Sequence, residues 1–132
     1  MPSLFERVDA VRQTQIEFAG KPFAFGSQDC AALVRFHLSL FGHAVPDLPN
    51  YRTRSGAVRA ARGVGGLDGV LDGLLEPIAP LQMLVGDVAF FRSSDGMGAL
   101  AIKAGRKFIG YHEESDTLAN IEPVMIEKAW RA

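Results

Sequence analysis

The stretch Phe23-Ala24-Phe25-Gly26-Ser27-Gln28-Asp29-Cys30-Ala31-Ala32-Leu33-Val34 places the only cysteine of the chain at the start of a predicted helix. Asp29 is a favoured N-cap residue, and Gly26 with Ser27 interrupts the preceding run, so the helix is expected to begin at or next to Cys30. The unpaired N–H groups and the positive end of the helix dipole favour the thiolate, which is the nucleophilic form of cysteine. The negative charge of Asp29 acts against this effect. Cys30 is therefore a candidate nucleophile.

A structural interpretation of Cys30 stands beside the catalytic one. The cysteine begins an apolar stripe with the spacing of a buried helix face, which continues through Leu33, Val34, His37, Leu38 and Phe41. Free cysteine is among the most buried residue types and often serves as a small apolar side chain. A catalytic role therefore depends on finding a histidine that can reach the sulfur.

Length and composition predict one compact domain over residues 1–132, large enough to be stable without disulfides or metals. The chain is 48% hydrophobic and 22% charged, with 14 basic and 15 acidic residues and a net charge of −1, so nucleic-acid binding is not favoured. A single cysteine excludes an internal disulfide and a cysteine-rich zinc site. We expect neither a metal nor another cofactor.

The sequence starts without the basic and apolar layout of a secretory signal, and no apolar run approaches membrane length. Synthesis in a cytoplasm and the absence of a membrane span are the expectations.

Hydrophobic periodicity divides the chain into a helical first half and a strand-rich second half. Helices are predicted over residues 4–18, from Cys30 to a stop at Gly42, over 55–62, and from Leu67 to about Leu75. Strands are predicted over 85–91, 98–104, 107–112 and 124–126, with a tight hairpin at Gly105-Arg106. Helices followed by antiparallel strands indicate an α+β domain. The one local basic cluster is expected to be a solvated helix face without a role: Arg52, Arg54, Arg59 and Arg62.

Three histidines are available as the base for a cysteine nucleophile. His37 lies seven residues after Cys30 in the same helix, roughly 10 Å away along the axis, and is expected to be a core or rim residue. His43 lies beyond the far end of that helix and is excluded by the same geometry. His112 remains by elimination, at the end of a predicted strand, although a half-exposed structural histidine is the alternative.

The order of Asp29-Cys30-Ala31-Ala32-Leu33-Val34, Gly86-Asp87-Val88-Ala89-Phe90-Phe91 and the hairpin around Gly105 resembles the papain-like NlpC superfamily of cell-wall cysteine peptidases. The resemblance implies that Cys30 matches the nucleophile and that the catalytic histidine opens the next strand, where this chain has Gly98 or Met97. His112 falls about two residues after the position of the third, orienting polar residue of the superfamily. The catalytic machinery implied by the resemblance is therefore incomplete.

A narrower resemblance covers nearly the whole chain. Its segments are Phe23-Ala24-Phe25-Gly26, Tyr51-Arg52-Thr53, Gly65-Gly66, Gly98-Ala99-Leu100-Ala101-Ile102 and Lys128-Ala129-Trp130-Arg131. Together they resemble a family of small phage and prophage tail-associated proteins of unassigned function, related to the NlpC-like proteins of tail assembly. This resemblance implies a papain-like fold, with a helical N-terminal half packed on a small antiparallel sheet. It also implies location in the virion tail and other tail-tip proteins as partners.

Two functional hypotheses follow from these observations. The first is a tail-tip or tail-assembly protein with an NlpC-like fold, catalytically degenerate and structural. The second is a cysteine endopeptidase that cleaves peptide bonds of peptidoglycan, with Cys30 as nucleophile and His112 as base. In the second case, backbone N–H groups near Cys30 supply the oxyanion hole.

Overall fold

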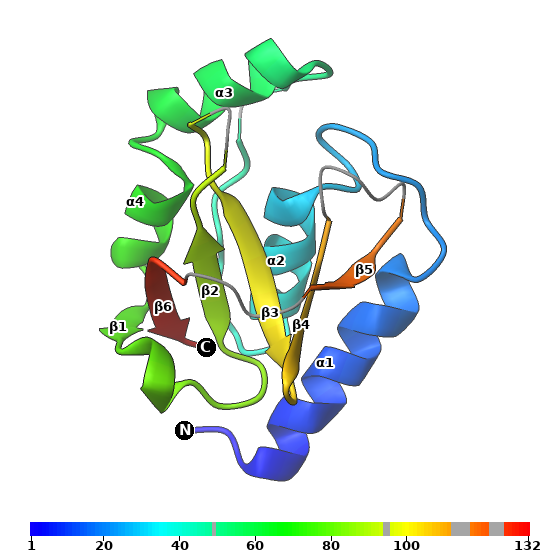
Figure 1. Cartoon of the computed structure of the whole chain (residues 1–132), viewed down its shortest axis with the longest axis vertical. Coiled ribbons are helices and arrows are strands. Elements are labelled where there is room, and N and C mark those ends of the chain that lie inside the picture. Colours follow the sequence, from blue (N-terminus) through cyan, green and yellow to red (C-terminus); the bar gives the residue numbers. More distant parts are fainter. Residues whose placement is uncertain (49, 94–95, 112–116, 122–125) are drawn as a thin grey trace.

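The computed structural model describes residues 1–48, 50–93, 96–111, 117–121 and 126–132 of the chain (Figure 1). Its helices are α1 (Leu4–Phe18), α2 (Cys30–Ser39), α3 (Arg54–Gly63) and α4 (Leu67–Asp72), with a short 3₁₀ helix η1 (Pro80–Gln82). Its strands are β1 (Glu76–Ile78), β2 (Val88–Phe91), β3 (Ala99–Ala104), β4 (Lys107–Gly110), β5 (Ala119–Ile121) and β6 (Lys128–Arg131). The predicted α+β fold, helical first and antiparallel second, is confirmed.

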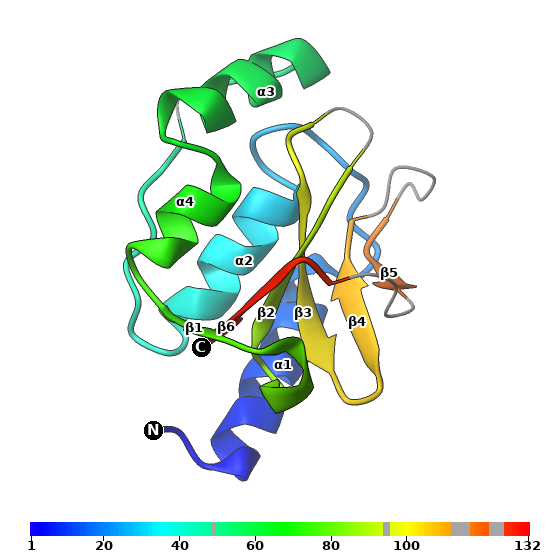
Figure 2. The same ribbon diagram turned by 60° about the vertical axis from the view of Figure 1, so that its left-hand side comes forward.

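The strands form one antiparallel sheet in the order β1-β6-β2-β3-β4-β5. Figures 1 and 2 show α1 and α2 on one face of this sheet, with α3 and α4 continuing from α2 around its edge. The main core fills the space between helices and sheet, and its largest fully buried side chain is Trp130 of β6. A smaller apolar cluster that includes Phe91 and Phe108 lies on the opposite face. Strands β2 and β3 are thus covered on both sides.

Helix α1 begins with a capping box formed by Ser3 and Glu6. The Ser3 hydroxyl accepts a hydrogen bond from the Glu6 N–H at 3.1 Å, and the Glu6 carboxylate accepts one from the Ser3 N–H at 3.3 Å. Two orphan donors of the first turn are satisfied in this way, and the helix keeps its predicted bounds of Leu4 and Phe18.

Several other boundaries differ from the prediction. Helix α2 ends at Ser39, three residues before the expected stop, because a turn precedes Gly42, whose φ is +84°. The apolar run to Leu75 contains a helix only as far as Asp72, since the chain then turns into β1. The first predicted strand starts at Val88 rather than 85, because the Asp87 N–H closes a turn onto the Leu84 carbonyl at 3.0 Å.

Three short strands were absent from the prediction: β1, β5 and β6. The strand expected over 124–126 lies mostly outside the described residues, and Ile126 itself belongs to no strand. Strand β6 was missed because it covers only four residues, Lys128–Arg131, and its polar-apolar-apolar-polar order does not alternate. It nevertheless lies between β1 and β2 in the sheet.

A buried carboxylate joins the two ends of the chain to the sheet. Asp87 is fully buried and accepts hydrogen bonds from Arg7 and Arg131, each at 2.9 Å, and from the Leu84 and Ala132 N–H groups. Because Arg7 is also buried, removing either partner would leave an uncompensated charge in the interior. Asp87 therefore has a structural role.

Candidate functional site

Cys30 lies at the first position of α2, where the sequence places it. The Asp29 carboxylate caps the helix by accepting a hydrogen bond from the Ala32 N–H at 2.9 Å. The cysteine is only 8% exposed and belongs to the main core cluster together with Leu33, Val34 and Leu100. Its sulfur thus lies where the helix start meets the sheet, beneath the surface.

The surroundings of Cys30 favour the neutral thiol. Burial, together with the smaller effect of the negative charge of Asp29, raises the pKa of the Cys30 thiol to about 11. Backbone groups of Leu100, Cys30 and Ala31 lower this pKa, but their effect is smaller than that of burial. The helix start therefore does not by itself produce a thiolate at neutral pH.

Asp29 has a second structural task, which occupies its other carboxylate oxygen. That oxygen accepts hydrogen bonds from the Gly26 N–H at 2.9 Å and from the Tyr51 hydroxyl. Burial and the bond to Asp29 both raise the pKa of Tyr51, so its hydroxyl is a donor here. Gly26 has a φ of +87°, and a Cβ at this position would lie 2.9 Å from the Tyr51 carbonyl oxygen. Asp29 thereby ties the loop before α2 to the segment around Tyr51.

Aromatic rings surround this loop. Phe23 makes edge contacts with Phe25 and Tyr111, and Phe25 makes one with Tyr51. Tyr111 is buried, and its hydroxyl has no hydrogen-bond partner within the described part of the chain. Burial raises the pKa of Tyr111, and the charge of Asp29 adds to this effect. The rings therefore give the helix start an apolar surround.

His37 is a core residue and points away from this site. Its Nε2 lies 2.8 Å from the Gly86 carbonyl oxygen and its Nδ1 lies 2.9 Å from the Thr14 hydroxyl. A carbonyl can only accept, so Nε2 carries the proton and Nδ1 accepts from Thr14. Burial lowers the pKa of His37 to about 4. Both ring nitrogens are occupied, and His37 does not serve as a base for Cys30.

Within the described residues, neither of the other two histidines supplies a base for Cys30. His43 follows α2, and its N–H bonds to the Leu38 carbonyl at the far end of the helix from Cys30. His112 lies outside the described residues, so its distance from the Cys30 sulfur stays a prediction.

The position from which the superfamily resemblance expects the base is closed by packing. Gly98 directly precedes β3 and has a φ of +83°, a conformation that residues with a Cβ rarely adopt. A Cβ at Gly98 would lie 2.2 Å from both Cε1 and Cζ of the Phe90 ring. The Phe90 ring thus fills the space into which a side chain at position 98 would project.

The position of the orienting residue is also a glycine. Gly110 ends β4, two residues before His112, and is buried. A Cβ there would lie 3.0 Å from Cδ1 of Ile121 and 3.3 Å from the Leu100 carbonyl oxygen. Larger side chains at this position would require Ile121 and the neighbouring strand to shift. This Cβ would lie beside Ala101 and Ile121 of the smaller apolar cluster, on the face of the sheet opposite the main core, so a side chain at position 110 would point away from Cys30.

A cavity of about 300 Å³ opens beside α2, and its lining includes Ala31, Val34, Leu48, Tyr51, Leu71 and Leu100. No histidine belongs to its described lining.

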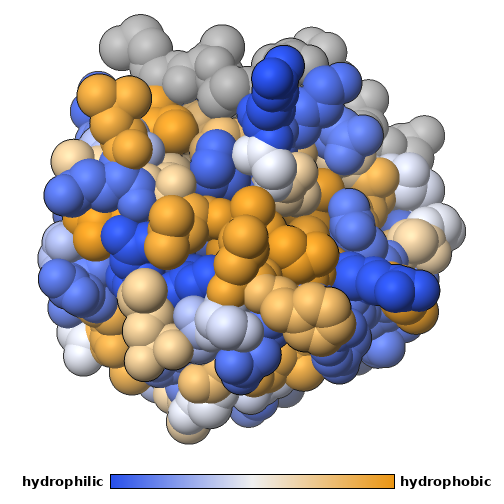
Figure 3. Space-filling view, turned by 90° about the horizontal axis from the view of Figure 1, so that it is seen from below, coloured by the Kyte–Doolittle hydropathy of each residue, from blue (hydrophilic) through white to orange (hydrophobic). Residues whose placement is uncertain are grey.

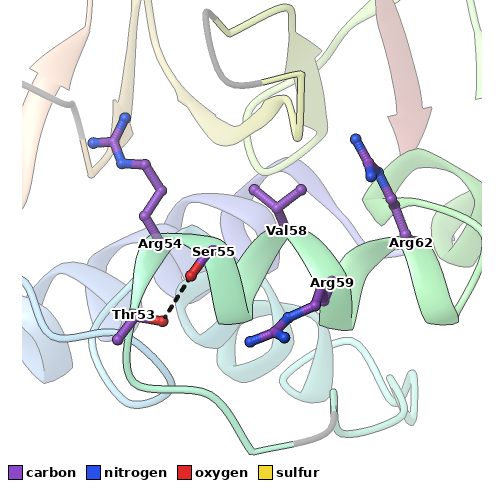
Figure 4. A pocket seen from close by; sticks show the side chains of 6 residues that line it. All are labelled: Thr53, Arg54, Ser55, Val58, Arg59 and Arg62. Atoms are coloured by element: carbon purple, nitrogen blue, oxygen red, sulfur yellow. Dashed lines mark hydrogen bonds between the residues drawn. The ribbon is translucent and has the colours of Figure 1, made fainter.

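A wider hollow of about 750 Å³ lies along α3 and is lined by Thr53, Arg54, Ser55, Val58, Arg59 and Arg62. Figure 4 shows Arg54, Val58 and Arg62 pointing from one side of the helix. Arg54, Arg59 and Arg62 are all exposed, as the predicted solvated basic face requires.

Sequence reasoning missed Phe90 and Tyr111 as determinants of this site. Phe90 alternates with its strand neighbours in the way any core residue does, so no pattern marks it as the residue packed on Gly98. Tyr111 directly precedes His112, the predicted base, and no sequence pattern marks it.

Comparisons with known proteins identify structures that are similar to this chain and a family model that matches it. RipA, a resuscitation promoting factor interacting protein, matches 99% of the chain with a TM-score of 0.66 and 15% identity, and the chain spans 65% of that structure. The NlpC/p60 domain of the peptidoglycan hydrolase SagA matches 95% of the chain at a TM-score of 0.60 and 17% identity, over 98% of its own length. RipD from Mycobacterium tuberculosis, described as a non-catalytic NlpC/p60 domain protein adapted to peptidoglycan binding, matches 99% at 0.57 and 14%, over 98% of its length. No curated protein matches the sequence.

Within the described residues, no helix is long and apolar enough to cross a membrane. At these identities the structural matches establish the fold, which is that of NlpC/p60 domains. The family model described as a domain of unknown function, DUF6950, matches residues 6–132, and the chain belongs to that family.

Proposed function

We propose that this protein is a phage tail component, at the tail tip or in tail assembly, in which an NlpC-like fold serves a structural role without hydrolysis. The observation that carries the loss of hydrolysis is the packing at Gly98, one of the two positions where the resemblance expects the base, because the Phe90 ring occupies the space that a side chain there would need. A cysteine without a general base loses most of the activation that makes its sulfur a nucleophile at neutral pH.

The state of the thiol supports the same proposal. Burial and Asp29 hold the pKa of Cys30 at about 11, so its thiolate fraction at pH 7 is on the order of one in ten thousand. The hydrogen bonds of Asp29 to Gly26, Ala32 and Tyr51 give the Asp29-Cys30 pair a structural purpose. RipD, described as non-catalytic, indicates that NlpC/p60 folds persist without the reaction.

The tail setting rests on the sequence resemblance to phage tail-associated proteins. It predicts other tail-tip proteins as partners and the virion tail as the location, with peptidoglycan as a further possible ligand. The test is quantitative mass spectrometry of particles purified from a lysogen that encodes this chain. A fixed number of copies per tail supports the proposal, and a chain found in the lysate but missing from purified particles overturns it.

The second candidate function is a peptidoglycan endopeptidase with Cys30 as nucleophile and His112 as base. It is favoured by the position of Cys30 at the helix start, where backbone groups of Leu100, Cys30 and Ala31 stabilise negative charge on the sulfur. Purified peptidoglycan is incubated with the wild type, Cys30→Ala and His112→Ala, and released muropeptides are measured. Release by the wild type that both substitutions abolish would establish this candidate in place of a purely structural role.

A further inference from the structure

The outer face of α1 carries two large apolar side chains that nothing in the described chain covers. Phe5 is 83% exposed and Ile16 is 70% exposed. They are eleven residues apart, so three helical turns, or about 16 Å, separate them along the axis. Scattered exposed apolar residues are ordinary, and the arrangement of these two is informative only together with the residues between them.

Asp9 and Arg12 lie between the two apolar residues on the same stripe. Phe5, Asp9, Arg12 and Ile16 follow one another at intervals of four, three and four residues, which places them within about 60° of each other around the helix. All four are exposed, and the buried residues of α1 lie on the opposite side. Intervals of four and three are those of the contact seam between two packed helices.

The order of the side chains along this stripe is self-complementary when two copies run antiparallel. With the centre of the contact between residues 10 and 11, Phe5 faces Ile16 of the second copy and Asp9 faces its Arg12. The twofold axis repeats both contacts. We propose that α1 mediates a homodimer, in which two α1 helices pack antiparallel through this stripe.

The charges of Asp9 and Arg12 favour a second copy of the chain as the partner and an antiparallel orientation of the two α1 helices. Arg12 has no ion-pair partner in the described chain, and Asp9 accepts a single side-chain hydrogen bond, from Gln13 at 2.7 Å. In a parallel pair, Asp9 would face Asp9 and Arg12 would face Arg12, and like charges in direct opposition are destabilising. The antiparallel pair places unlike charges at its centre and apolar residues at its two ends.

The Phe5 end of the stripe adjoins more apolar surface. Leu4 and Val8, on the neighbouring side of α1, are 67% and 49% exposed, and Leu81 of η1 is fully exposed. Figure 3 views the end of the molecule that holds the start of α1 and shows apolar atoms gathered over the middle of that face. The Ile16 end of a second copy would approach the edge of this surface, which increases the apolar area that the dimer covers.

A single helix face is smaller than the ~1,200 Å² of standard protein interfaces, so we expect weak dimers, with a dissociation constant on the order of 0.1–1 mM. Sedimentation velocity of the full chain over roughly 10 µM to 1 mM tests this expectation. A wild type that stays monomeric over that whole range overturns the proposal.

Charge reversal provides the specific test. Asp9→Arg and Arg12→Asp each create like-charge contacts across the twofold axis, and each is expected to weaken self-association roughly tenfold or more. Mixing the two variants restores unlike charges at both central contacts, so the mixture is expected to associate as strongly as the wild type. Association that is unchanged in the single variants, or that the mixture fails to restore, overturns the antiparallel register.

Two controls separate the interface from general effects. Arg62→Asp on α3 changes the net charge as Arg12→Asp does, on a different exposed helix, and is expected to leave association unchanged. Phe5→Ala with Ile16→Ala removes the apolar ends and is expected to weaken association further. Because all these side chains are exposed, circular dichroism is expected to show unaltered folding. Equal loss of association in Arg62→Asp would assign the effect to net charge and overturn the proposal.

Discussion

Gly98→Ala is expected to destabilise this protein through two separable effects. The backbone at Gly98 has a φ of +83°, a conformation that costs a residue with a Cβ roughly 1–3 kcal/mol. The added Cβ would also lie 2.2 Å from two atoms of the Phe90 ring, and forcing the ring aside costs roughly 1–3 kcal/mol more. The expected loss in the free energy of unfolding is therefore about 2–6 kcal/mol.

Gly105→Ala is the matched control. Gly105 has a φ of +85°, yet a Cβ at this position would meet nothing within 4 Å, so only the backbone cost of roughly 1–3 kcal/mol is expected. Phe90→Leu removes the two ring atoms that the Cβ would strike. In the Phe90→Leu background, Gly98→Ala is expected to cost no more than Gly105→Ala.

Urea denaturation of the four variants measures both effects, and the double-mutant cycle isolates the contact with Phe90. The coupling free energy between positions 98 and 90 is expected to be roughly 1–3 kcal/mol. Gly98→Ala that costs the same as Gly105→Ala, without coupling to position 90, would refute the explanation that the Phe90 ring closes this position.

Three further expectations concern buried polar groups. Because burial raises the pKa of Cys30 to about 11, iodoacetamide at pH 8 should alkylate the folded chain far more slowly than the urea-unfolded chain, with a rate that rises towards pH 11; equal rates would contradict this. The pKa of His37 is about 4 in the folded state against about 6.5 when unfolded, so the unfolded state binds the proton first. Stability should be intact above pH 6.5 and fall by up to about 3 kcal/mol between pH 6.5 and 4, a loss that His37→Gln should reduce. Asp87→Ala should cost about 3–5 kcal/mol in urea denaturation, since it leaves buried Arg7 unpaired, whereas a loss below about 1 kcal/mol would show that water solvates Arg7 there.

Local signals were sufficient for most of the helices and for the central hairpin. The capping box at Ser3 and the N-cap at Asp29 act within one helical turn, so the sequence alone places both helix starts. The hairpin at Gly105 is equally local, since β3 and β4 flank a two-residue turn. The edges of the sheet depend on pairing between distant segments, which is why β1 and β6, paired as Pro77 with Trp130, were not predicted.

The candidate site shows the same division between local and distant information. The position of Cys30 at a helix start depends on neighbours within four residues, and sequence reasoning found it. The pKa of the thiol depends on burial by other elements, which no pattern around Cys30 reveals. The closure of position 98 depends on Phe90, eight residues earlier and across a strand pair, where only the three-dimensional register brings ring and glycine together.

The Asp29-Cys30 pair carries the sequence resemblance of this chain to NlpC-like cysteine peptidases, yet each of the two residues also has a structural role in the fold. The Asp29 carboxylate accepts hydrogen bonds from the Ala32 N–H, the Gly26 N–H and the Tyr51 hydroxyl. Cys30, at the start of α2, packs into the core with Leu100. These structural roles explain both residue types at a helix start. A short carboxylate such as that of Asp29 suits the N-cap, and a small apolar side chain such as that of Cys30 suits the crowded first turn. The pair therefore cannot distinguish an active enzyme from a structural domain. That distinction depends on which side chains face the sulfur, and at Gly98, one of the two positions where the resemblance expects the base, the Phe90 ring leaves no room for a side chain.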